Sequence, residues 1–123
     1  MESDKEIFGK FLIEKLRNTA VGCAKGLADN AFQSPGHQEY QRLIATFDSK
    51  QKEILVRIVE YCTEGAINDF LYHLDEKMRK GGEIQVLVKG VPITELSPAL
   101  YKELWGEGGW WATYGNDEYK KKQ

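Results

Sequence analysis

The chain has 123 residues, of which 41% are hydrophobic and 29% charged, and its formal net charge is −2. This length fits one domain of about 100–150 residues, and so many hydrophobic residues exclude intrinsic disorder. The near-neutral balance excludes a polycationic nucleic-acid binder and a strongly acidic DNA mimic. We expect a single domain over residues 1–123, with a helical core over 1–82, a hairpin and cap over 83–119 and a frayed basic tail over 120–123.

The N-terminal segment and the cysteines indicate the cellular location. Residues 1–6 are acidic and mixed in charge, unlike the basic start of a secretory signal. No apolar run approaches the roughly 20 residues needed to span a bilayer. Cys23 and Cys62 are the only cysteines, which excludes a disulfide scaffold and a four-cysteine zinc site. We therefore expect a cytoplasmic protein without membrane contact, in which both thiols stay reduced.

A first long helix is predicted over residues 4–30. Ser3 lies three positions before Glu6, which is the pattern of a capping box. Apolar residues then recur at helical spacing, so we expect them to form one stripe along the helix. The members of this stripe are Ile7, Phe8, Phe11, Leu12, Leu16, Ala20, Cys23, Ala24 and Leu27. We expect a bend near Asn18–Thr19.

Two further helices follow a proline–glycine turn. The second helix is predicted over residues 37–47. Asp48 or Ser49 then caps a third helix that extends to the glycine pair Gly81–Gly82. Such a helix would be nearly 45 Å long at about 1.5 Å per residue, so we expect a break or kink near Thr63–Gly65.

After the glycine pair, the sequence period changes from helical to alternating. In an extended chain, one side would carry Ile84, Val86 and Val88 and the other Gln85, Leu87 and Lys89, and a second short apolar run follows over 91–94. Two such runs around a glycine predict a β-hairpin. Pro92 lacks a backbone N–H group, so the second strand is expected to lie at an edge.

The C-terminal part is predicted to cap the helices. Ser97 before a proline is a good helix start, which predicts a short helix over 98–105 that the glycines of residues 106–109 end. Residues 110–114 are then expected to pack back on the core. The expected fold class is α+β but mostly α, a three-helix core with a small β-hairpin and a short helical and aromatic cap.

Few residues are suited to holding a metal ion. Asp69 and His73 lie four positions apart on one helix face, on the same side as Cys62. With a fourth group from another element, these residues could bind a metal or a small molecule. The simpler interpretation is that Asp69 pairs with His73 on a partly buried surface, and no specific ligand pattern is present.

The sequence offers no catalytic centre that we can assign, and it predicts no cofactor. Cys62 and His73 lie about 16 Å apart along one helix, too far for a nucleophile and its base, and buried free cysteines are the commoner case. Glu60 and Glu64 are four positions apart, which usually indicates a solvated face. The glycines of residues 106–109 lack the lysine and hydroxyl of a phosphate-binding loop.

The C-terminal third is acidic and aromatic. Residues 91–119 contain five acidic side chains against one lysine, which argues against nucleic-acid binding. Trp105 and Trp110 are expected to cap the core, since large rings bury about 150–250 Å² each. Trp111 and Tyr114 are equally suited to the core or to a contact with a partner, because neighbouring residues cannot all face inward.

One segment carries a resemblance to known proteins. Glu95-Leu96-Ser97, Leu100, Glu103-Leu104 and Gly106-Glu107-Gly108-Gly109-Trp110 follow the apolar run Ile84–Val88 and Gly90. The pattern resembles the C-terminal end of small bacterial proteins, some of which are similar to immunity partners of secreted toxins. The resemblance covers residues 67–114 and includes no catalytic motif. It implies a bacterial origin and a binding role, and it assigns no site residues.

The resulting hypothesis is a non-catalytic interaction protein, plausibly an immunity-type protein that neutralises a toxin by occlusion. The expected partner is a protein with a basic or neutral surface, and neither nucleic acid nor membrane is expected to bind. The contact surface would comprise Glu95, Glu103, Glu107, Trp111 and Tyr114. Two alternatives remain, a metal- or small-molecule-binding domain that uses Asp69 and His73, and a structural homo-oligomer assembled through the long helix.

Overall fold

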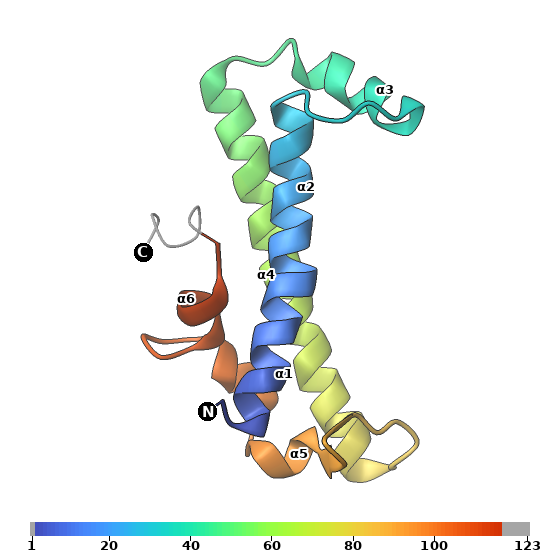
Figure 1. Ribbon diagram of the computed structural model, residues 1–123, viewed down its shortest axis with the longest axis vertical. Helices are drawn as coiled ribbons and strands as arrows, with labels where there is room; N and C mark the ends of the chain where they lie inside the picture. The colour runs from blue at the N-terminus through green and yellow to red at the C-terminus, as the bar shows by residue number, and fades with distance from the viewer. Residues whose placement is uncertain (1, 117–123) are drawn as a thin grey trace.

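The computed structural model describes residues 2–116 and is a long helical hairpin with short elements packed at one end (Figure 1). The elements in chain order are α1 (Asp4–Leu12), a π-helix (Ile13–Arg17), α2 (Asn18–Ala28), α3 (Pro35–Ile44), α4 (Ser49–Lys80), β1 (Leu87–Val88), β2 (Val91–Pro92), α5 (Ile93–Leu96), a 3-10 helix (Leu100–Leu104) and α6 (Trp110–Tyr114). The predicted class, mostly helical α+β, is confirmed. No helix among the described residues is long and apolar enough to cross a membrane.

The first arm of the hairpin is one continuous rod from α1 through the π-helix to α2 (Figure 1). Ser3 caps its start by accepting a hydrogen bond from the Glu6 backbone N–H at 3.2 Å. The predicted bend near Asn18–Thr19 is instead the π-helix, which ends just before Asn18. A π-helix contains an extra residue in its turn, so it shifts which side chains face inward.

That shift contradicts part of the predicted apolar stripe. The stripe that faces α4 contains the buried residues Ile13, Arg17, Val21, Ala24 and Ala28. Of the predicted members, Ala24 is buried, whereas Phe11, Leu16 and Cys23 are exposed. Much of the apolar surface of this arm therefore lies outside the core.

The second arm of the hairpin is α4, an unbroken helix of 32 residues. Asp48, one of the two predicted caps, caps it, and it also forms a reciprocal capping box with Gln51 that was not singled out from the sequence. The break predicted near Thr63–Gly65 does not occur, since the helix is continuous from Ser49 to Lys80. Gly65 lies on the exposed side of the helix, where a β-carbon would meet no atom within 4 Å. An exposed glycine costs about 1 kcal/mol of helix stability relative to alanine but does not interrupt the backbone hydrogen bonds.

The connection between the arms carries α3, which lies across the top of the hairpin in Figure 1. This helix starts and ends two to three residues earlier than predicted, because Pro35 occupies its first position. Gln41 is buried and holds the preceding loop through both atoms of its amide. Its Oε1 accepts from Phe32 N, and its Nε2 donates to Phe32 O, both at 3.0 Å.

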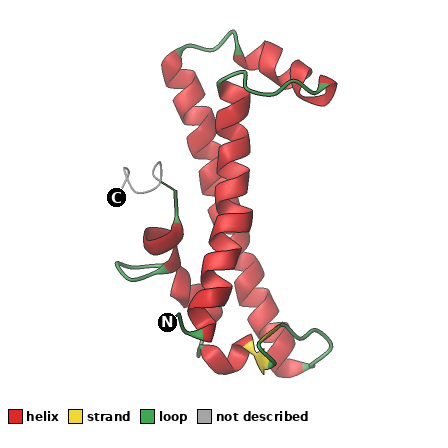
Figure 2. Cartoon of the chain, in the orientation of Figure 1, coloured by secondary structure: helices red, strands yellow, loops and turns green. Residues whose placement is uncertain are grey.

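The hairpin predicted after α4 forms, but its strands are shorter than expected (Figure 2). Leu87 pairs with Pro92 and Val88 with Val91 in antiparallel register. Lys89 and Gly90 between them both have positive φ, of 51° and 83°, which is the backbone of a type I′ turn. The second predicted strand is cut short because residues 93–96 form α5.

Past α5, the predicted helix over 98–105 is replaced by the 3-10 helix Leu100–Leu104. The Ser97 hydroxyl accepts from Ala99 N at 3.2 Å and so forms a local turn instead of capping an α-helix. Residues 110–114 pack back on the helices as α6, as predicted. The basic tail predicted to fray, residues 120–123, lies outside the described residues.

The main hydrophobic core lies where the C-terminal elements meet α1 and the second half of α4. Its buried members are Ile13, Ile67, Leu71, Leu74, Met78, Ile93, Leu100, Leu104, Trp110 and Trp111. Gly9 is essential to this packing, because a β-carbon there would overlap the Trp110 indole. We call this half of the molecule the capped end, and we call α2, α3 and the first half of α4 the open end.

Candidate functional site

The predicted contact residues divide into two groups in the structure. Glu95 and Glu107 are exposed, and Glu107 lies in the loop between the 3-10 helix and α6. Glu103 points into the fold, where its carboxylate accepts from the Ser97 hydroxyl at 2.5 Å and pairs with Lys5 Nζ at 3.3 Å. Only the first two of these carboxylates are therefore fully available to a partner.

Both predicted aromatic contacts contribute to the capped end. The Trp111 side chain is 1% exposed and belongs to the core, so its ring is not available as a contact surface. The Tyr114 hydroxyl donates to Glu6 Oε1 at 2.6 Å, and Trp110 Nε1 donates to the other oxygen of Glu6 at 3.3 Å. Burial and the hydrogen bond to Glu6 raise the pKa of Tyr114.

Trp105, which we expected in the core, is half-exposed. Its Nε1 donates to Asn68 Oδ1 on α4 at 2.9 Å, and its ring meets Trp111 edge-on at a centroid distance of 5.9 Å. The ring is thus held in place while 52% of the residue remains accessible. A tryptophan fixed in this way needs little ordering when it binds a partner.

Two tyrosines on the same part of the molecule were not singled out from the sequence. Tyr72 of α4 and Tyr101 of the 3-10 helix meet edge-on at 5.6 Å, and Tyr72 is 48% exposed. Both line a shallow hollow of about 200 Å³ that also contacts Asp75 and Glu76. We call Tyr72, Tyr101, Trp105 and Glu107 the acidic-aromatic surface. The three aromatic groups come together because the 3-10 helix lies on α4, where Tyr101 meets Tyr72 and Trp105 binds Asn68, and Glu107 follows Trp105 by two positions. The sequence alone could not predict this arrangement.

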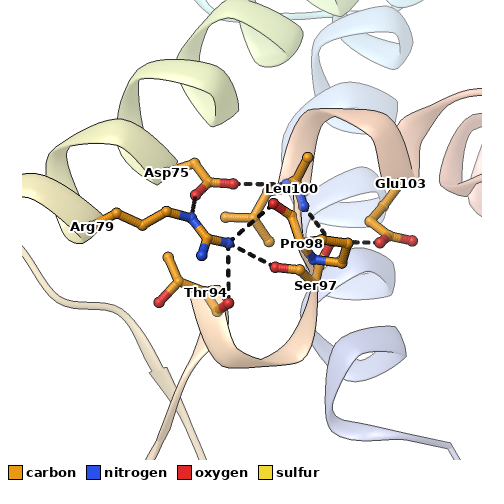
Figure 3. Close-up of polar contacts among 8 residues, drawn as sticks. Asp75, Arg79, Thr94, Ser97, Pro98, Leu100 and Glu103 are labelled. Carbon is orange, nitrogen blue, oxygen red and sulfur yellow. Dashed lines mark hydrogen bonds and ion pairs between the residues drawn. The ribbon is translucent and has the colours of Figure 1, made fainter.

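A buried carboxylate holds this surface in shape (Figure 3). Asp75 binds the Arg79 side chain with one oxygen and accepts from Leu100 N at 2.9 Å with the other. The Arg79 Nη2 donates to the carbonyl oxygens of Thr94 at 3.1 Å and Ser97 at 2.8 Å. One guanidinium thereby fixes the end of α5 and the start of the 3-10 helix against α4.

A second polar cluster surrounds a fully buried arginine in the middle of the hairpin. Arg17, at 0% exposed, lies between Glu60 and Glu64 of α4, with nitrogen–oxygen distances of 3.1 Å to each. Its Nη1 donates to Asn18 Oδ1 at 2.8 Å and to Asn116 Oδ1 at 2.7 Å. We call these five residues the arginine cluster.

The arginine cluster corrects the prediction that Glu60 and Glu64 lie on a solvated face. Glu60 is only 8% exposed, and both carboxylates bind the same guanidinium. The sequence signal that we missed is Arg17 itself, since it lies at the helical spacing of Ile13 and Val21. A buried guanidinium with this many acceptors is a structural group, because its donors are committed within the fold.

The cysteines also depart from expectation, since Cys23 and Cys62 are both exposed rather than buried. Cys62 lines a groove between α2 and α4, and His73 lines a different hollow further along α4. Asp69 is exposed on the same helix. Among residues 2–116, no group of three or more histidine, cysteine, aspartate or glutamate side chains is arranged to hold a metal ion.

Comparison of the chain with known protein families, curated proteins and solved structures found no match in any of the three. The resemblance of residues 67–114 to immunity-type proteins therefore stays a prediction from the sequence.

Proposed function

We propose that the protein is a non-catalytic interaction domain that binds another protein through the acidic-aromatic surface. The observation that carries this proposal is the half-exposed Trp105, whose ring is fixed by Asn68 and Trp111 beside the tyrosine pair. Tryptophan and tyrosine are the residue types that most often dominate binding energy at interfaces. The surface replaces the predicted pair Trp111 and Tyr114 with aromatic groups that are accessible.

The charges of this surface indicate the kind of partner. Glu107 is exposed in its glycine-rich loop, and Glu76 borders the hollow beside Tyr72. Tyrosine faces also attract cations, so a lysine or arginine of the partner fits this place. A toxin with a basic surface that is occluded by this domain fits the resemblance of the C-terminal segment.

The experiment compares the proteins retained by four immobilised variants from an extract of the native host, measured by quantitative mass spectrometry. Trp105→Ala and Glu107→Lys change the acidic-aromatic surface. Tyr40→Ala and Glu39→Lys make matched changes at exposed positions of α3, at the other end of the molecule. We expect one basic protein to be lost with the first pair and retained with the second.

The retained protein is then purified and its Kd measured against the same variants. A hot-spot tryptophan predicts a loss of about 2 kcal/mol or more, which is roughly a 30-fold weaker Kd for Trp105→Ala. If all four variants bind any retained protein equally, the acidic-aromatic surface is not the binding site. Protection of cells that express the retained protein tests the immunity role separately.

A further inference from the structure

The hairpin has a second exposed surface, which lies on the other side of α4 from the acidic-aromatic surface. An apolar groove of about 440 Å³ runs between the two arms. Leu16 and Ala20 of the first arm and Cys62, Ala66 and Phe70 of α4 line it. Positions 62, 66 and 70 follow one side of α4, whereas Asn68 and Tyr72, which contact Trp105 and Tyr101, follow the opposite side.

A hollow and a projecting ring lie next to each other on this groove. Phe70 is 56% exposed and Leu16 47% exposed, and the same groove is lined by the small residues Ala20, Cys62 and Ala66 above the buried Ile67. Small residues let a second helix come close, and a large ring then fills the space that they leave. A face that contains both shapes side by side is complementary to itself under a two-fold rotation.

The distribution of charge along the chain also favours contact between two copies at this groove. The protein carries a net charge of −2, so two copies repel each other unless they meet where charges are few. None of the side chains that line the groove is charged. The acidic carboxylates Glu95 and Glu107 belong to the C-terminal elements, away from the groove.

We propose that two copies of this chain pack groove to groove as a two-fold dimer, which forms a four-helix bundle from two hairpins. Phe70 of each copy occupies the groove of the other, and the axis passes near Ala66. A helix pair alone leaves one stripe of each helix open, whereas four helices bury it. The acidic-aromatic surface stays outside the bundle, so the dimer presents it twice.

The apolar area of the groove determines how tightly the two copies are expected to bind each other. Phe70 at 56% exposed and half-exposed Leu16 line the groove, and half-exposed Ile84 lines the neighbouring hollow that Phe70 also borders. Together they offer roughly 300 Å² of apolar surface per copy, given about 150–250 Å² for an aromatic side chain. Standard interfaces take about 800 Å² from each partner, so the polar rim must supply the rest. We therefore expect a Kd of about 1–100 µM rather than an obligate dimer.

The first experiment measures molar mass by light scattering and sedimentation over a range of concentrations. We expect the mass to rise from the 14.1 kDa of one chain to twice that value. Phe70→Glu and Ala66→Glu place a charge in the groove at exposed positions, and each should weaken the dimer at least about 30-fold. Tyr61→Glu, on the opposite side of α4, serves as the matched control and should leave the mass curve unchanged.

The second experiment locates the axis by crosslinking. In a background with both cysteines changed to serine, Ala66→Cys should form a disulfide dimer on mild oxidation, whereas Tyr61→Cys should not. A wild-type chain that stays monomeric at about 300 µM, several times the weakest expected Kd, would overturn the proposal. Crosslinking at position 61 but not 66, or growth beyond two copies, would overturn it as well. Binding of a partner at the acidic-aromatic surface is unaffected by any of these outcomes.

Discussion

The two ends of the hairpin are built on different principles. At the capped end, α1 and α4 enclose Trp110 and Trp111 together with leucine and isoleucine side chains from three C-terminal elements. At the open end, the two arms face each other through small residues such as Ala24 and Ala28, with α3 as the only addition among the described residues. The comparison indicates that the capped end supplies most of the stability, while the open end leaves apolar surface for contacts with other chains.

The sharpest test of this comparison makes the same substitution at each end. Gly9→Ala places a methyl group inside the Trp110 ring, so we expect the free energy of unfolding to fall by about 3 kcal/mol or more. Gly22→Ala, in the interior of α2, meets no atom within 4 Å and should raise it by about 0.5–1 kcal/mol. Urea denaturation measures both. Equal effects would show that the two ends do not differ in packing.

The arginine cluster joins the two ends, and its removal should cost a comparable amount. Arg17→Ala leaves two buried carboxylates without their shared cation, so we expect a loss of about 3–5 kcal/mol in the free energy of unfolding. Lys15→Ala, at an exposed position in the same π-helix, should change it by less than about 0.5 kcal/mol. A small loss for Arg17→Ala would mean that water replaces the guanidinium.

A change confined to the open end should have a smaller and more local effect. Gln41→Ala removes both hydrogen bonds to Phe32, with an expected cost of about 1–3 kcal/mol. Native-state hydrogen exchange should show faster exchange for the amides of α3 and the loop before it. The amides around Leu71 in the capped end should keep their protection. Equal acceleration at both ends would show that the molecule opens as one unit.

The smallest expected effect concerns alkaline pH at the capped end. The pKa of Tyr114 lies above its ordinary value of 10.0, because the phenol is partly buried and donates to Glu6. The folded state therefore holds this proton more tightly than the unfolded chain, which adds to the free energy of unfolding. This contribution is fully present below pH 10 and is lost as the pH rises through the raised pKa. The decline in unfolding free energy from about pH 8 to about pH 11 should be shallower in Tyr114→Phe. If the unfolding free energies of the wild type and of Tyr114→Phe fall equally over this pH range, the pKa of Tyr114 is not raised in the folded state.

The sequence predicted the features that depend on local chemistry. The caps at Ser3 and Asp48, the tight turn before Gly90 and the length of α4 all follow from neighbouring residues. What it could not predict depends on contacts between distant segments. The π-helix that brings Arg17 to Glu60 and Glu64 is one such case, and the inward position of Trp111 is another.

The candidate surface likewise has one part that the sequence predicted and one part that depends on contacts between distant segments. The acidic and aromatic character of the C-terminal segment is visible in the sequence, and Glu95 and Glu107 are accessible as expected. Which tryptophan faces outward is decided by Asn68 on α4, 37 positions before Trp105. The spacing of apolar residues within one segment cannot reveal a hydrogen-bond partner that lies in a distant segment.

The hydrogen bonds that tie Glu6 to Tyr114 and Arg17 to Asn116 have a consequence for biosynthesis. These partners are 108 and 99 positions apart, so the first helix leaves the ribosome long before the C-terminal groups that cover it. Because domains generally complete folding only when their distant contacts can form, the nascent chain carries an open helical face until the C-terminal elements are synthesised. We expect stalled chains that end before position 110 to be captured by chaperones, and full-length chains to be released.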